Sequence, residues 1–156
     1  MFSYVMQDEI GCKVLLVDAT FRDDGVGARL GHRLAPGFME LLYNDEHNFD
    51  ALVYPTRRQN IHILPAGVLT GKVLPSLAPD RVRPILDTAC DRFDYVLIQQ
   101  GSVLGDTRYV PIARAADLIL LLVEDGVTPV EELEECQRLF RDHQVSNIRV
   151  VMSKQG

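Results

Sequence analysis

The sequence predicts an α/β protein in which helices sandwich a mainly parallel sheet. Five apolar runs mark the chain, and most are continuous rather than alternating, which is the pattern of strands buried on both faces of a parallel sheet. Segments with helical spacing of apolar residues lie between several of these runs, and alternation of strands with helices is typical of this class. The runs cover residues 13–19, 60–67, 94–100, 116–125 and 147–153.

The elements between the first runs can be justified in order. GVGARLG at 25–31 contains glycines but no lysine and indicates a turn and a helix start. FDALVYP at 49–55 predicts a further short strand. PDRVRPILDTACDRF at 79–93 predicts a helix with one apolar face, and its Pro84 falls early, where a helix tolerates proline best. The apolar face consists of Val82, Ile85, Leu86, Ala89 and Phe93.

TPVEELEECQRLFRDH at 128–143 predicts the last helix. We expect Thr128 to cap it, Pro129 to occupy its first position, and Glu131 to complete a T-x-x-E capping box. A mostly apolar stripe is expected to face the sheet, and it consists of Val130, Leu133, Gln137 and Phe140.

Composition favours one domain over residues 1–156, with 47% apolar and 24% charged residues. The net charge of −6 argues against a surface that tracks nucleic-acid phosphates, and no apolar run approaches the roughly 18 residues that span a bilayer. The three cysteines are far apart and fit neither a disulfide framework nor a zinc site, so we expect reduced thiols, a cytoplasmic location and no metal centre.

Ligands of parallel sheets bind beyond the carboxyl ends of the strands, which directs attention to the loops after the runs. The run 13–19 delivers Asp18 there, with Thr20 and Arg22 close behind, a combination that often serves an anionic ligand. Two bland alternatives stay open. Asp18 could simply end a strand and cap the next turn, and Arg22 could be a surface arginine paired with Asp23 or Asp24.

KVLLVDATFR resembles the second phosphate-site motif of the MinD/ParA-like deviant P-loop ATPases. It is more similar still to the bacterial tyrosine kinase (BY-kinase) domains that control exopolysaccharide chain length and export. Further motifs follow in that family's order, and the similarity covers nearly the whole chain. They are GFMELL (37–42), IHILPAG (61–67), FDYVLIQQGSVLGD (93–106) and AADLILLLVEDGVT (115–128).

The resemblance implies a P-loop NTPase-like fold whose first strand and glycine-rich phosphate loop should precede residue 1. FSYVMQDEIG at 2–11 looks like the end of the helix that follows this loop, and the 156 residues contain no G-x-x-x-x-G-K-[ST]. We therefore expect a single domain that is incomplete at its N-terminus. A sheet without that strand would expose two unpaired edges, unless the native chain extends upstream or neighbouring strands close the gap.

Two substitutions weaken the family's catalytic site. Gln99 stands where the family has an aspartate that orients magnesium, and Thr20 replaces the second carboxylate of D-x-D. A glutamine keeps an acceptor oxygen but not the charge that a hard cation needs. The catalytic remnant is then Asp18, Gln99 and Asp106. Asp18, Thr20 and Arg22 are the candidates for cofactor contacts, and we expect Asp18, Arg22, Gln99 and Asp106 to lie together at one end of the sheet.

Cofactor binding in the family also depends on the glycine-rich phosphate loop. Phosphate binding there needs several backbone N–H groups, a helix N-terminus and a lysine together, so we expect no cofactor for the chain as given. ATP and Mg²⁺ would apply only with an upstream loop. In the kinases the arginine that corresponds to Arg22 contributes to contacts between subunits, which makes Arg22, Arg29 and Arg33 the interface candidates.

Two functional classes remain, and the sequence leaves open whether the chain is an enzyme. The first is a degenerate BY-kinase-like domain, a pseudoenzyme that acts in exopolysaccharide biosynthesis or export by protein interaction. Its partner would be a membrane-anchored polysaccharide co-polymerase or a second copy, which would bring a cytoplasmic protein to the inner membrane without insertion. The second is an ATP-dependent tyrosine kinase, or a MinD/ParA-like ATPase, whose nucleotide loop lies upstream.

Overall fold

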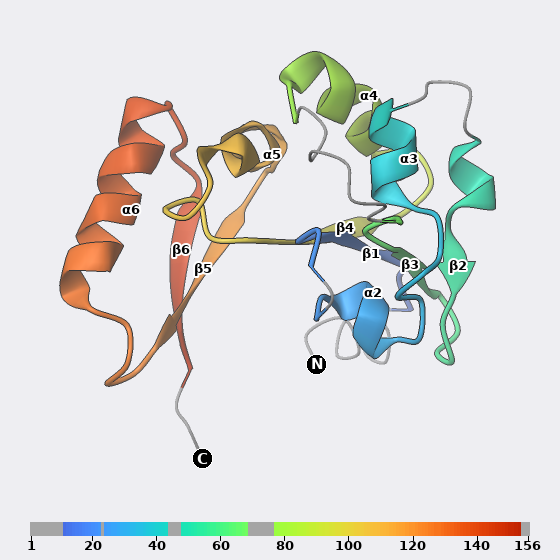
Figure 1. The fold of residues 1–156 in the computed structure, drawn as a ribbon, viewed down its shortest axis with the longest axis horizontal. Coiled ribbons are helices and arrows are strands. Elements are labelled where there is room, and N and C mark those ends of the chain that lie inside the picture. Colours follow the sequence, from blue (N-terminus) through green and yellow to red (C-terminus); the bar gives the residue numbers. More distant parts are fainter. Residues whose placement is uncertain (1–10, 23, 44–47, 69–76, 154–156) are drawn as a thin grey trace. The chain divides into compact units, whose positions relative to one another are not determined.

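A computed structural model of the protein describes residues 11–22, 24–43, 48–68 and 77–153 (Figure 1). The chain divides into two compact units, Met1–Gly101 and Ser102–Gly156, and each is described by itself. None of the helices in the described ranges is long and apolar enough to cross a membrane.

The first unit contains a four-stranded sheet in the order β2-β3-β1-β4. β1 (Val14–Ala19) lies between β3 (Ile61–Leu64) and β4 (Tyr95–Gln100) and is parallel to both, as the continuous apolar runs predict. β2 (Tyr54–Pro55) pairs antiparallel with β3, so 49–55 contributes a shorter strand than predicted. A proline is tolerated there because β2 is an edge strand.

Helices cover both faces of this sheet. Figure 1 shows α3 (Phe38–Tyr43) and α4 (Pro79–Cys90) on one side and α2 (Val26–Arg29) on the other, while the 3-10 turn η1 (Phe49–Ala51) precedes β2. The predicted apolar face of α4 is confirmed, because Val82, Ile85, Leu86 and Ala89 are buried; Phe93 lies beyond the end of the helix.

The second unit contains a two-stranded parallel sheet, β5 (Ile119–Glu124) with β6 (Ile148–Ser153). Its helical elements are η2 (Thr107–Tyr109), α5 (Val110–Ala115) and α6 (Val130–Asp142). All five predicted apolar runs therefore form strands, and the architecture is α/β with mainly parallel pairing. The core of this unit includes Ile112, Cys136, Phe140 and Val145.

The predicted start of the last helix is wrong in detail. Pro129 is the N-cap of α6 and makes no side-chain capping bond. The hydroxyl of Thr128 instead accepts the backbone N–H of Glu124 at 3.0 Å, which closes the turn before the helix. The predicted apolar stripe is confirmed for Phe140, which is buried, and Leu133 is half-buried. It is wrong for Val130, which is 65% exposed, and for Gln137, which is also exposed, while Cys136, outside the predicted stripe, is buried.

The prediction that the strands are buried on both faces holds for β1 and β3 but is wrong for β5 and β6. Leu120 and Leu122 of β5 are 41% and 73% exposed, and Met152 of β6 is 62% exposed. The physical reason is the number of neighbouring strands. Each strand of a two-stranded sheet is an edge strand, so its side chains have a paired strand on one side and none on the other. In the same way β4 is the end strand of its own sheet, and among the described strands it pairs with β1 alone.

Candidate functional site

The strands β1 and β4 bring two of the predicted site residues together. Asp18 and Gln99 are Cα partners in the parallel register, at the carboxyl ends of adjacent strands. This is the end of the sheet at which α/β proteins bind their ligands.

The carboxylate of Asp18 is 1% exposed and its oxygens accept three hydrogen bonds from the chain itself. Oδ1 accepts from the backbone N–H of Thr20 at 3.1 Å and from its hydroxyl at 2.7 Å. Oδ2 accepts from the backbone N–H of Gly27 at 2.8 Å. A buried carboxylate is tolerated only with such donors, so Asp18 is a satisfied structural acceptor in this conformation.

Gln99, on the neighbouring strand β4, also accepts a hydrogen bond from the start of α2. Its side-chain oxygen accepts the backbone N–H of Val26 at 2.7 Å. The first N–H groups of a helix lack partners within the helix, and the N-cap residue of α2, Gly25, offers no side chain. Asp18 and Gln99 together therefore hold the first turn of α2.

Two glycines allow this close approach. A Cβ on Gly25 would lie 2.6 Å from both Oδ1 of Asp18 and Oγ1 of Thr20, and one on Gly27 would lie 3.1 Å from Oδ2 of Asp18. The φ of Gly25 is −66°, so space and not backbone conformation requires the glycine. The sequence pattern GVG predicts a turn but not this role. The only signal was the occurrence of two glycines shortly after a buried aspartate.

Phe21 gives the chain its sharp turn after β1. Its φ is 51°, a left-handed conformation that a bulky residue rarely adopts. The ring is buried and stacks on Phe38 with a centroid distance of 6.1 Å, and this packing holds the strained conformation.

The guanidinium of Arg22 lies at the surface. Its side chain is 70% exposed and its Nε lies 3.0 Å from Oδ1 of Asp24, which matches the surface-pair alternative. Arg29 ends α2 and Arg33 lies in the turn that follows, and both are exposed. The ring of His32, between them, packs on Tyr54 at 5.0 Å and anchors this turn to β2.

Asp106 belongs to the second unit and serves its local structure. Its carboxylate caps η2 by accepting the backbone N–H of Arg108 at 3.0 Å, and it forms an ion pair with the guanidinium of the same residue. Hydrogen bonding from Arg108 lowers the pKa of the Asp106 carboxyl. The structure thus brings Asp18, Thr20 and Gln99 together, while Arg22 turns to solvent and Asp106 lies in the other unit.

The LPAG loop is closed by the start of α3. Backbone N–H groups of Phe38 and Met39 donate to the carbonyls of Pro65 and Ala66 at 2.8 and 3.0 Å. Glu40 joins the two segments, since its carboxylate accepts the N–H groups of Gly37 at 2.6 Å and Val68 at 3.0 Å. Both motifs are visible in the sequence, but the hydrogen bonds by which Glu40 joins them are not.

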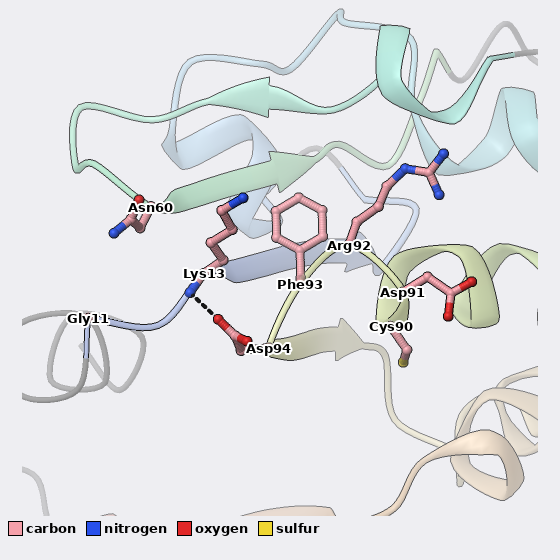
Figure 2. Close-up of a pocket in the computed structure, with 8 residues that line it drawn as sticks. All are labelled: Gly11, Lys13, Asn60, Cys90, Asp91, Arg92, Phe93 and Asp94. Atoms are coloured by element: carbon pink, nitrogen blue, oxygen red, sulfur yellow. Dashed lines mark hydrogen bonds between the residues drawn. The ribbon is translucent and has the colours of Figure 1, made fainter.

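A hollow of ≈ 460 Å³ lies at the opposite end of the sheet, where β1, β3 and β4 begin (Figure 2). Lys13, Asn60 and Asp94 stand at the starts of these strands, and Asp94 accepts the backbone N–H of Lys13 at 2.8 Å. The guanidinium of Arg92 points away from Lys13 and is bound to Asp50 at 2.8 Å. None of the predicted site residues lines this hollow.

Asp18 and its hydrogen-bond partners show whether the site could hold ATP and Mg²⁺ in this conformation. The carboxylate is covered and satisfied internally, and the neighbouring side chain, Gln99, carries no charge. In the described ranges no three or more His, Cys, Asp or Glu side chains cluster in a way that could hold a metal. In this conformation the described residues do not fit the cofactor, because a hard cation needs free oxygen ligands.

Comparison with known proteins adds to this geometry. No family model matches the chain. It is similar to the succinoglycan biosynthesis transport protein ExoP of Rhizobium meliloti, with 30% identity over 135 residues. The match covers 85% of this chain but only 16% of ExoP, so the chain spans a small part of the curated relatives that it matches.

Solved structures are similar over almost the whole chain. The BceF tyrosine kinase domain matches with a TM-score of 0.79 and 26% identity, over 95% of this chain and 59% of that one. The cell-division protein MinD of Aquifex aeolicus matches with a TM-score of 0.72 and 16% identity, over 97% of this chain and 60% of that one, a likeness of fold alone.

The fold is that of P-loop NTPase-like α/β domains, the class to which both structural matches point. Within that class of fold the chain is BY-kinase-like, since it is similar to the BceF tyrosine kinase domain and to ExoP.

Proposed function

We propose that the chain acts in exopolysaccharide biosynthesis or export, and that it works there by protein interaction and not by phosphoryl transfer. The observation that supports this most is the internal use of the Asp18 carboxylate, beside an uncharged Gln99. ExoP is named for succinoglycan biosynthesis, and BceF for a tyrosine kinase domain. The fold is kept in this chain while the charge that phosphoryl transfer needs is reduced.

The proposed partner is a membrane-anchored polysaccharide co-polymerase, or a second copy of the chain. Such contacts would bring a cytoplasmic domain to the inner membrane through its partner. The candidate surface carries Arg22, Arg29 and Arg33, all exposed. Leu34 follows Arg33 in the chain and is 80% exposed, and an exposed apolar side chain next to an arginine suits an interface anchor.

Substitution of Arg22 tests this surface. Arg22→Glu is expected to weaken association by about 1–3 kcal/mol if the arginine becomes a buried anchor, and far less if it lies on a rim. The measurement is co-purification and sedimentation with the cognate membrane regulator. Arg83→Glu is the matched control, because Arg83 is also exposed and bound to an aspartate, at 2.9 Å. If the wild type stays monomeric and retains no component of the export machinery, the proposal is wrong.

One observation favours the second class, an ATP-dependent kinase whose loop lies upstream. Among the described strands β4 ends its sheet and β5 pairs with β6 alone, so each has an edge that could take up a further strand. The genomic sequence before residue 1 tests this, since a G-x-x-x-G-K-[ST] within about thirty residues would supply one strand–loop–helix unit. For the chain as given, calorimetry with ATP and Mg²⁺ is expected to show no binding in the micromolar range.

A further inference from the structure

The strand β4 has a neighbour on one side of its backbone only. Among the described strands it pairs with β1 alone, and none of its six residues is buried, whereas five of the six residues of β1 are. The side chains of β4 carry no charge. An edge of this kind presents a row of N–H and C=O groups that can pair with a strand of another chain.

The pairing with β1 shows which backbone groups of β4 face outward. The N–H of Tyr95 donates to the carbonyl of Lys13 at 3.2 Å, on the β1 side. Successive residues of a strand turn their N–H and C=O groups to opposite sides, so the alternate residues Tyr95, Leu97 and Gln99 face β1. The residues between and after them face away from β1, and they are Val96, Ile98 and Gln100.

The outward residues form a set that is complementary to itself. In an antiparallel pair, opposite residues at alternate positions exchange both of their N–H···O bonds. With a two-fold axis at Ile98, this residue pairs with its own copy, and Val96 pairs with Gln100 in both directions. An axis at Leu97 would instead place Gln100 opposite Asp94, whose N–H already has a partner. In the first register no charges oppose each other, and two β-branched isoleucines meet.

We propose that two copies of the chain associate edge to edge through β4, antiparallel and in register about Ile98, so that their first sheets become one. The contact is isologous, because the same strand serves both copies. This inference rests on the proposed function, in which a second copy is one of the two partners. It deepens that function by naming the strand that the second copy uses.

A proline at position 98 tests the register. The N–H of Ile98 points away from β1, so Ile98→Pro removes no bond of the chain's own sheet but removes the central donor of each copy. Sedimentation velocity at increasing protein concentration should show a monomer–dimer equilibrium in the wild type. The dissociation constant should rise about tenfold or more in Ile98→Pro. Ile98→Val is the matched control, because it keeps the N–H and a β-branched side chain, and it should associate like the wild type.

Amide hydrogen exchange of the wild type, followed by NMR, needs no variant and decides the matter even if Ile98→Pro does not fold. Exchange at Val96, Ile98 and Gln100 should slow about tenfold as the protein concentration rises through the dissociation constant. Leu97 and Gln99 donate toward β1, so their amides should be protected at every concentration. This alternation is specific to pairing along the β4 edge.

Three results would overturn the inference. The first is a wild type that stays monomeric at every concentration, and the second is a dimer that Ile98→Pro leaves intact. The third is slow exchange at the outward residues in dilute, monomeric protein, because a segment of the same chain would then cover the edge. None of these measurements contains the membrane regulator. A monomeric protein that still co-purifies with the regulator therefore rejects this inference and leaves the proposed function standing.

Discussion

Two strands of similar sequence, β1 (VLLVDA) and β5 (ILLLVE), have different environments. Both contain six residues and an acidic side chain near the end. Leu15 of β1 is fully buried, whereas Leu122 of β5 is 73% exposed. β1 has a parallel neighbour on each side and helices on both faces, while β5 pairs with β6 alone. An apolar run thus predicts a strand, but the number of its neighbours decides how deeply it is buried.

The largest expected effect comes from truncation of one leucine in each strand, Leu15 in β1 and Leu122 in β5. Leu15→Ala should lower the free energy of unfolding by about 2–5 kcal/mol, because it removes buried methyl groups and leaves a cavity. Leu122→Ala should change it by less than about 0.5 kcal/mol, because the side chain is mostly in water already. Urea unfolding followed by circular dichroism measures both. Equal losses in the two variants would show that β5 is covered in solution.

The polar side chains at the carboxyl ends of the adjacent strands β1 and β4, Asp18 and Gln99, sharpen the comparison next. Asp18→Ala should cost about 3 kcal/mol of unfolding free energy, because the buried N–H of Gly27 and the Thr20 donors lose a charged acceptor. Gln99→Ala should cost about 1 kcal/mol, since one neutral bond is lost at an exposed position. Asp24→Ala, which breaks only a surface ion pair, is the control in the same urea experiment. A loss below that of Gln99→Ala would contradict the structural role of Asp18.

A smaller effect on stability is expected from His62, whose protonation makes the stability of the first unit depend on pH. Burial, with a contribution from the charge of Lys13, lowers the pKa of its imidazole below 6.5. A lowered histidine pKa means that the unfolded chain binds the proton first, so stability is highest above pH 6.5 and falls as the pH drops through the lowered pKa. NMR titration of the ring should give a pKa below 6.5, and Lys13→Gln should raise it partway. A normal pKa in the wild type would show that the ring is solvated.

The smallest effect belongs to Asp106 in the second unit. Its pKa is lowered from 3.8 by hydrogen bonding from Arg108, so the stability that this pair contributes is present above that pH and is lost as the pH falls through the lowered pKa. Arg108→Gln should raise the pKa of the Asp106 carboxyl with little change in stability at neutral pH, because the pair is solvated. NMR titration of the carboxyl is the measurement, and an unchanged pKa in the variant would contradict the contact.

The sequence was sufficient for the strands, because each one coincides with a run of apolar residues. It also predicted the apolar face of α4, where spacing alone decides which residues are buried. It did not predict local hydrogen bonds where a side chain has two possible partners. Thr128 bonds to the turn before α6 instead of capping the helix, and both arrangements suit a threonine.

At the site, the sequence predicted that Asp18 and Gln99 would be neighbours, because both end parallel strands. It did not predict that the start of α2 would occupy them. That arrangement depends on the unusual backbone of Phe21 and on the lack of a side chain at Gly25, which no periodicity encodes. The roles of Arg22, Arg29 and Arg33 stay predictions.

The two edge strands of the first sheet, β2 and β4, differ in how readily each could pair with a further strand. At one edge β2 has two residues and contains Pro55, which has no N–H to offer a further strand. At the other edge β4 has six residues, none of them charged or proline. Natural sheets use such residues to prevent strand addition, and of these two edge strands only β4 lacks them. Sheet extension, whether by a physiological partner or by unwanted aggregation at high concentration, is therefore expected to be one-sided, and a single lysine placed in β4 would block it.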